Sequence, residues 1–122
     1  MTFDYDDQNI FARILRGEIP NKTVYENEHA LAFADIAPQA PVHVLVIPKG
    51  PYVSLDHFAG HASVEEQAGF FQAVAEVCRI AGVDDGFRTI ANTRAHGVQD
   101  VPHFHMHILG GRRLGRMLPE PA

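Results

Sequence analysis

The sequence is poor in the features that mark secreted, disulfide-stabilised and membrane proteins. Its single cysteine, Cys78, has no partner for a disulfide within the chain. No apolar run is long enough to span a bilayer. The first seven residues are acidic, whereas a secretory signal begins with basic residues and continues with apolar ones. We therefore expect a cytoplasmic protein with no membrane partner.

Basic residues are scarce as well. The chain has 10 Lys and Arg against 15 Asp and Glu, which gives a net charge of −5. This balance argues against a broad surface for nucleic acid or anionic lipid, so no nucleic-acid partner is expected. A small anionic substrate needs only a local cluster of donors, and the eight histidines can supply one.

The length of 122 residues fits one compact domain with a core of its own. We find no internal repeat, low-complexity stretch or linker, so residues 1–122 are taken as a single domain. Residues 113–122 follow no clear periodicity. They are expected to be loosely ordered or to dock on a partner subunit.

Hydrophobic periodicity predicts two helices. Near-helical spacing of apolar residues predicts a short helix over residues 9–16, which Gly17 and Pro20 end. The residues from Ser63 to Glu66 resemble a capping box that opens a long helix, and Gly82 is expected to end it. The apolar stripe of this helix consists of Phe70, Val74, Val77, Cys78 and Ala81.

Alternation and β-branched residues predict five strands. They cover residues 23–26, 30–35, 42–47, 87–92 and 102–109. Two prolines make residues 35–41 a loop, and residues 93–100 are expected to form a polar loop. Strands in mixed order with helices set apart predict an α+β fold. It has a five-stranded, mainly antiparallel sheet, one short N-terminal helix and one long central helix.

The last predicted strand carries His103, His105 and His107 at alternate positions. Because successive side chains of a strand point to opposite faces, the three imidazoles are expected to share one face, roughly 6.6 Å apart. Three interpretations are open: histidines on a strand surface, a three-histidine metal site, or a nucleophilic histidine with helpers. Their spacing alone does not separate the last two.

The segment from His103 to Leu109 is similar to the signature of the histidine triad (HIT) superfamily, in which three histidines alternate with hydrophobic residues. Residues 35–49 resemble a second hallmark segment, and Ile10-Phe11 with residues 17–20 resembles the opening helix. The likeness covers about residues 8–113. Gly110-Gly111-Arg112 after the triad is similar to the Hint branch, the histidine triad nucleotide-binding proteins.

The resemblance implies a HIT-like fold and a hydrolase for purine nucleoside phosphoramidates or acyl-nucleotides. Such enzymes cleave the P–N or related bond at the α-phosphate through a covalent nucleotidyl-histidine. It implies a purine nucleoside monophosphate-type ligand, no cofactor and no metal. It also implies a homodimer, built by the fifth-strand region and the long helix. Two alternatives stay open: a dinucleoside polyphosphate hydrolase of the same superfamily, or a non-catalytic nucleotide-binding or scaffold protein.

Residue roles also follow from the resemblance. His105 would be the nucleophile, oriented by the backbone carbonyl of His103, while His107 and His43 would line the phosphate site. Asp35 would accept hydrogen bonds from the ribose hydroxyls. The base would lie between Ile10, Phe11, Ile14, Phe33 and Ile36. The phosphate and leaving group would be bordered by Asn92, Gln99, Asp100 and Val101.

Three departures from the family pattern bear on these roles. Asp100 stands where the branch often has a serine that contacts the leaving amine, so leaving-group preference or phosphate affinity is expected to differ. Asn9 and Ala12 stand where some relatives have cysteines that bind structural zinc, so no zinc is expected there. The chain has no tryptophan, which some relatives carry in the tail.

Overall fold

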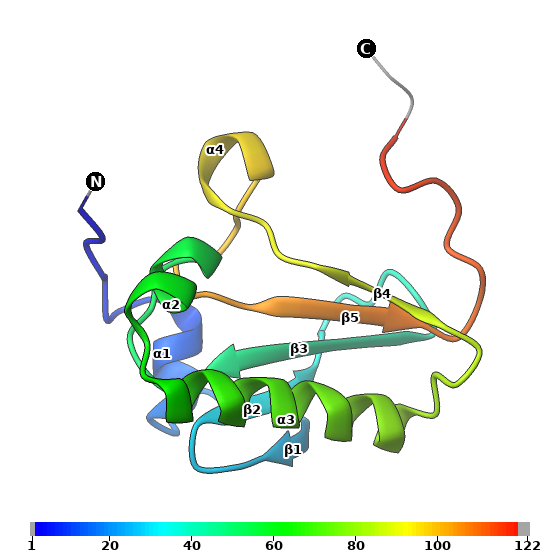
Figure 1. Ribbon diagram of the computed structural model, residues 1–122, viewed down its shortest axis with the longest axis horizontal. Helices are drawn as coiled ribbons and strands as arrows, with labels where there is room; N and C mark the ends of the chain where they lie inside the picture. The colour runs from blue at the N-terminus through cyan, green and yellow to red at the C-terminus, as the bar shows by residue number, and fades with distance from the viewer. Residues whose placement is uncertain (1, 120–122) are drawn as a thin grey trace.

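The computed structural model describes residues 2–119, and they form an α+β fold around one five-stranded sheet (Figure 1). The strand order is β1-β2-β3-β5-β4, and every neighbouring pair is antiparallel. This confirms the predicted fold class. In chain order the elements are α1 (Ile10–Leu15), β1 (Thr23–Glu26), β2 (Ala30–Ala34), β3 (Val42–Pro48), α2 (Leu55–His61), α3 (Val64–Ala81), β4 (Phe87–Ile90), α4 (Arg94–Gly97) and β5 (Met106–Gly110).

Helices cover both faces of the sheet, which is why its inner strands are mostly apolar, with His43 on β3 and His107 on β5 as exceptions. Figure 1 shows α3 lying across one face. Alternate residues of β2 and β3 point toward α3, and the others point toward α1. The α3 face buries Ala30, Ala32, Val44 and Val46 with Phe58, Phe70 and Phe104. The α1 face buries Leu31, Phe33, Leu45 and Ile47 with Phe11 and Ile14.

Helix α3 begins and ends where the sequence predicts. The Ser63 hydroxyl accepts a hydrogen bond from the Glu66 backbone N–H, and the Glu66 carboxylate accepts one from the Ser63 N–H, each at 3.1 Å. These two bonds satisfy donors that a helix start leaves without partners. Gly82 ends the helix in the left-handed region at φ 66°, where a Cβ would be strained.

The predicted strand over residues 102–109 is wrong at its start. β5 begins at Met106, and residues 103–105 form no ladder with β3 or β4. The Phe104 N–H instead donates to the Tyr52 carbonyl at 2.7 Å, in the connection between β3 and α2. The predicted strand over 87–92 also ends early, at Ile90. Helices α2 and α4 were not predicted, and α4 occupies part of the expected polar loop.

Residues 111–119 form no helix or strand. The guanidinium of Arg88, on β4, donates to the carbonyls of Gly115 and Arg116 and so ties part of the tail to the sheet. The last three residues of the predicted tail lie outside the described residues. Within residues 2–119, no helix has the length and apolar character needed to cross a membrane.

Candidate active site

Two strands bring a histidine pair together on the α1 face of the sheet. In the β3–β5 register His43 lies opposite Leu109, and Leu45 lies opposite His107. Leu45 belongs to the cluster beneath α1, so His43 and His107 share that face. Their imidazoles meet with Nε2 of His43 2.9 Å from Nδ1 of His107. The sheet register therefore builds the first half of the site.

His105 lies next to this pair, immediately before β5, and is 5% exposed. Its ring packs edge-to-face on His107 and on Phe11 of α1, with centroid distances of 5.1 and 5.0 Å. Its Nδ1 lies 2.8 Å from the His103 carbonyl oxygen. A carbonyl can only accept, so Nδ1 carries the proton and Nε2 of a neutral ring keeps its lone pair.

Burial keeps the His105 ring neutral. Desolvation lowers the pKa of His105 below its usual range and outweighs three opposing effects. These are the hydrogen bond to the His103 carbonyl and the negative charges of Asp100 and Asp35. Near pH 7 the side chain is thus an imidazole with one available nitrogen lone pair, which is the nucleophilic form.

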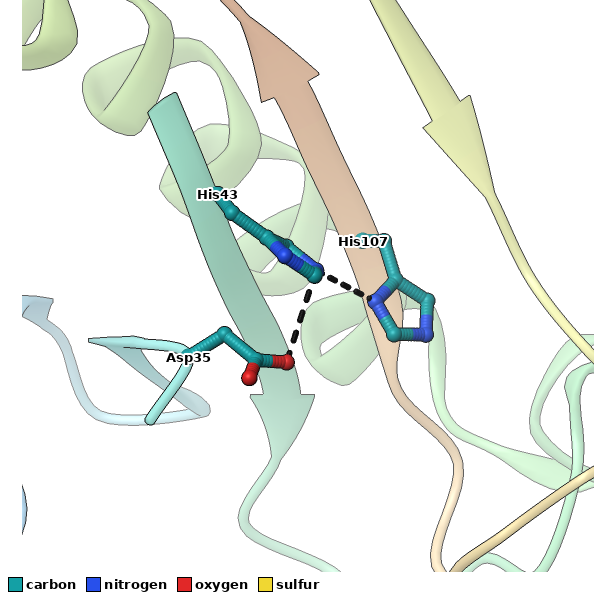
Figure 2. Close-up of side chains that lie close together, drawn as sticks. All are labelled: Asp35, His43 and His107. Atoms are coloured by element: carbon teal, nitrogen blue, oxygen red, sulfur yellow. Dashed lines mark hydrogen bonds and ion pairs between the residues drawn. The ribbon is translucent and has the colours of Figure 1, made fainter. Parts of the chain in front are cut away.

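A chain of hydrogen bonds assigns the protons of His43 and His107, and Figure 2 shows its part between Asp35, His43 and His107. The Gln39 backbone N–H donates to Nδ1 of His43 at 3.0 Å, so the His43 proton is on Nε2. That N–H points at His107 Nδ1 and also lies 3.4 Å from a carboxylate oxygen of Asp35. His107 accepts at Nδ1 and therefore carries its own proton on Nε2.

His107 is neutral as well. Burial first, and then the proximity of His105 and His43, lower the pKa of His107 to about 4. Its Nε2–H is then a donor that brings no positive charge of its own. A lone pair on His105 thus lies beside a neutral N–H donor on His107, an arrangement suited to attack on an anionic centre.

Asp35, His43 and His107 also meet the spacing of a metal site, with one ligand atom from each within 4.8 Å of the others. The hydrogen bonds oppose such a site. To ligate through Nε2, His43 would have to move its proton to Nδ1, where the Gln39 N–H already donates. The expectation that the site works without a metal stays a prediction, and the proton positions support it.

His103 contacts Phe11 of α1, as His105 does, with ring centroids 6.3 Å apart, but it does not belong to the strand on which it was expected. It lies outside β5 and is fully buried. Its Nε2 lies 2.8 Å from the Pro48 carbonyl, and its Nδ1 lies 2.6 Å from the Tyr5 hydroxyl. Burial lowers the pKa of His103 to about 4. Both ring nitrogens are therefore occupied, and only its backbone carbonyl reaches His105.

The residues expected to hold the base differ widely in their exposure. Phe11, Ile14 and Phe33 are buried in the core beneath α1. Ile10 is 43% exposed and Ile36 is 97% exposed, so these two offer apolar surface to a ligand. Asp35 follows β2, and one of its carboxylate oxygens accepts from the Ala37 N–H at 2.8 Å.

The loop between β4 and β5 is held by amide side chains. Asn92 donates to the Gly97 carbonyl at 2.7 Å. Gln99 donates to the carbonyls of Val53 and Val101, at 2.6 and 2.9 Å. The Gln99 side chain, expected to border the phosphate, is thus engaged in fixing the loop. Asp100 is exposed, and its charge acts on both His105 and His107.

Sequence reasoning missed two groups of the site. Tyr5 is 98 positions from His103, and it lies in an N-terminal segment with no periodic pattern. The Gln39 N–H is a backbone group, which no residue type identifies. A motif search over the triad could find neither of them, because both contacts depend on how distant segments meet in the fold.

The chain is similar to a known protein family and to several proteins in it. Residues 16–114 match the family described as the HIT domain. An uncharacterised 13.2 kDa HIT-like protein of Azospirillum brasilense is 56% identical over 119 residues, covering 97% of this chain and 98% of that protein. The purine nucleoside phosphoramidase of Escherichia coli K12 is 42% identical over 116 residues, covering 92% and 94%. A HIT family hydrolase from Clostridium thermocellum superposes with a TM-score of 0.82 at 32% identity, covering 93% and 99%.

Proposed function

The chain belongs to the HIT family, and from this premise we propose that it is a nucleotide-binding hydrolase. Its substrates are purine nucleoside phosphoramidates or acyl-nucleotides, cleaved at the α-phosphate. One observation carries the proposal: the His103 carbonyl holds the proton of His105 on Nδ1, at 2.8 Å. That bond leaves Nε2 free of a proton beside the neutral ring of His107.

In the first step, Nε2 of His105 attacks the α-phosphorus in line with the leaving group. A P–Nε2 bond forms as the bond to the leaving amine or carboxylate breaks, and a leaving amine takes up a proton from solvent. The Nδ1–H bond to His103 strengthens as the ring becomes cationic. The His107 Nε2–H is placed to donate to a phosphoryl oxygen, where negative charge is concentrated.

In the second step, water attacks the phosphorus of the nucleotidyl-histidine. The P–Nε2 bond breaks as the water oxygen bonds to phosphorus and a water proton passes to solvent, so a nucleoside monophosphate leaves and the His105 lone pair is restored. The low exposure of His105 limits bulk water around the intermediate. No cofactor takes part in either step of this scheme.

For nucleotide binding we assign the base to the exposed apolar surface of Ile10 and Ile36. The second carboxylate oxygen of Asp35 would accept from the ribose hydroxyls, because the Ala37 N–H engages only the first. The 42% identity to the E. coli protein named purine nucleoside phosphoramidase supports the purine and the P–N bond. We further propose that the active form is a homodimer.

The deciding experiment compares the wild-type chain with His105→Ala on adenosine phosphoramidate. We expect turnover by the wild type and a loss of at least about a thousandfold in kcat for the variant, as for other covalent nucleophiles. Rapid quenching and mass spectrometry of tryptic peptides should find a nucleotidyl group on the peptide containing His105. His96→Ala, a solvent-exposed histidine in α4, is the matched control and should keep wild-type rates.

The same assay separates the alternatives. Faster turnover of a diadenosine polyphosphate than of the phosphoramidate would favour the polyphosphate hydrolase. Tight binding of adenosine monophosphate with no turnover of any substrate would favour a binding protein. Full activity in His105→Ala would remove the proposed mechanism altogether.

A further inference from the structure

The N-terminal segment before α1 has no regular structure, yet it reaches the most deeply buried polar side chain of the site. Tyr5 comes from this segment, and its hydroxyl oxygen lies 2.6 Å from Nδ1 of His103. The two rings also meet edge-to-face, with centroids 5.6 Å apart. No catalytic role described above uses Tyr5.

Proton positions show which group donates. The other ring nitrogen of His103, Nε2, lies 2.8 Å from the Pro48 carbonyl, so it must carry the proton. Burial keeps the ring neutral, because it lowers the pKa of His103 to about 4. Nδ1 therefore has only a lone pair, and the Tyr5 hydroxyl donates to it. Burial also raises the pKa of Tyr5, which preserves the phenol as a donor.

The anchoring of His103 matters because the sheet does not hold this residue. β5 begins only at Met106, so no strand ladder fixes the direction of the His103 carbonyl. The peptide unit between His103 and Phe104 is held at its N–H, which donates to Tyr52 at 2.7 Å. Its planar trans geometry directs the carbonyl the opposite way, toward Nδ1 of His105. The remaining anchor is the His103 ring.

We propose that Tyr5 is a positioning residue for the nucleophile, acting through His103. By donating to Nδ1 it fixes the ring and proton of His103, and so it fixes the carbonyl that sets the proton of His105. The N-terminal segment is thus part of the active-site support. This inference rests on the proposed function for its kinetic consequence, but its structural part can be tested without turnover.

The test variant is Tyr5→Phe, which removes only the hydroxyl. Without it, Nδ1 of His103 is a buried acceptor with no partner, and the ring can turn or exchange its proton. We expect kcat on adenosine phosphoramidate to fall about tenfold with KM nearly unchanged, because the nucleophile is misplaced while the nucleotide contacts stay. Tyr25→Phe is the control. Tyr25 is a partly buried tyrosine on β1 whose hydroxyl forms no hydrogen bond among residues 2–119.

Long-range ¹⁵N–¹H spectra of the histidine rings provide the readout that a merely stabilising role would not move. In the wild type we expect protons on Nε2 of His103 and on Nδ1 of His105. In Tyr5→Phe the fraction of His105 with its proton on Nδ1 should fall, and in Tyr25→Phe it should not. Incorporating 3-fluorotyrosine at position 5 retains a hydroxyl donor and should keep kcat within about twofold of the wild type.

The outcomes distinguish this inference from the proposed function. Wild-type protein with no turnover on any nucleotide would end the proposed function, and the histidine spectra would still decide the role of Tyr5. Unchanged kcat and unchanged ring spectra in Tyr5→Phe would overturn the positioning role. If that variant does not fold, a wild-type spectrum with the His103 proton on Nδ1 would overturn it as well.

Discussion

At the scale of single residues, backbone groups give identical side chains different chemistry. The Gln39 N–H makes His43 a donor toward His107, whereas the His103 carbonyl makes His105 a lone-pair nucleophile. Neither assignment follows from the residue type, because a neutral imidazole can carry its proton on either nitrogen. Each histidine is therefore best assigned a role by the polar group that faces it.

Asp100 is the residue whose replacement should change kinetics without disturbing this network. Its exposed carboxylate raises the pKa of His105 and of His107, partly offsetting burial, and it repels an incoming phosphate. We expect Asp100→Ser to lower KM for adenosine phosphoramidate about threefold to fivefold, the range for an exposed charge interaction. Steady-state kinetics at low and high salt should show the difference shrinking as salt screens the charge.

Asp85→Ser is the matched control for that measurement. Asp85 is an exposed carboxylate in the turn between α3 and β4, so its removal changes the net charge equally. A similar fall in KM for both variants would assign the effect to net charge and not to the position of Asp100. A rise in KM for Asp100→Ser would show that the carboxylate contacts the substrate favourably.

The sequence identified most of the candidate site but not how it is held together. His105 and His107 could be named because imidazole is rare enough for alternate spacing to be informative, whereas His43 was named only from the family resemblance. The role of His103 could be assigned only to its carbonyl, and that depended on family resemblance. Its burial against Tyr5 could not be foreseen, since a contact across 98 positions leaves no local periodicity.

At the scale of elements, the predictions succeeded where local chemistry decides the structure. The capping box at Ser63 and the glycine at position 82 fix the ends of α3 within its own few residues. The start of β5 depends instead on Tyr52, a distant group that takes the Phe104 N–H out of the ladder. The alternation of residue types continues through residues 102–105 although no strand forms there, and residues 103–105 are all buried.

Elements also decide where two chains can associate. β5 lies between β3 and β4, so β4 and not β5 presents a free edge on that side of the sheet. Two large apolar side chains are exposed on the elements in question, Phe71 on α3 and Phe87 on β4, at 55% and 49%. If these surfaces pair in the proposed homodimer, Phe71→Glu should convert it to a monomer. Sedimentation equilibrium measures this directly, with Gln72→Glu as a control of equal added charge on the same helix.

Two results would contradict that assignment. A wild-type chain that sediments as a monomer at micromolar concentration would remove the homodimer. A Phe71→Glu variant that stays dimeric would place the interface elsewhere. Apolar side chains exposed singly are normal on monomers, so the association measurement is needed and exposure alone does not decide.

At the scale of the whole molecule, the buried histidines tie stability to pH. An unfolded histidine titrates near 6.5, whereas burial lowers the folded-state pKa of His103 and of His107 to about 4 and lowers that of His105 too. Between these values the unfolded chain binds more protons, so protonation favours unfolding. The stability contributed by the neutral rings is complete above about pH 6.5 and is lost as pH falls toward about 4.

The expected loss in the free energy of unfolding at low pH is large for a domain of this length. A pKa lowered from 6.5 to about 4 corresponds to about 3 kcal/mol for His103 alone, against about 5 to 15 kcal/mol for a typical domain. Urea denaturation between pH 7.5 and 4.5 should therefore show a free energy of unfolding that is nearly constant down to about pH 6.5 and falls below it. His103→Gln, which keeps an amide donor toward the Pro48 carbonyl, should be less stable at pH 7.5 but should show a flatter slope. His96→Gln, at an exposed position, should keep the wild-type slope.

Equal slopes of the free energy of unfolding against pH in all three proteins would contradict this. They would mean that carboxylates such as Glu66, whose pKa is lowered by its bond to Ser63, control the acid response.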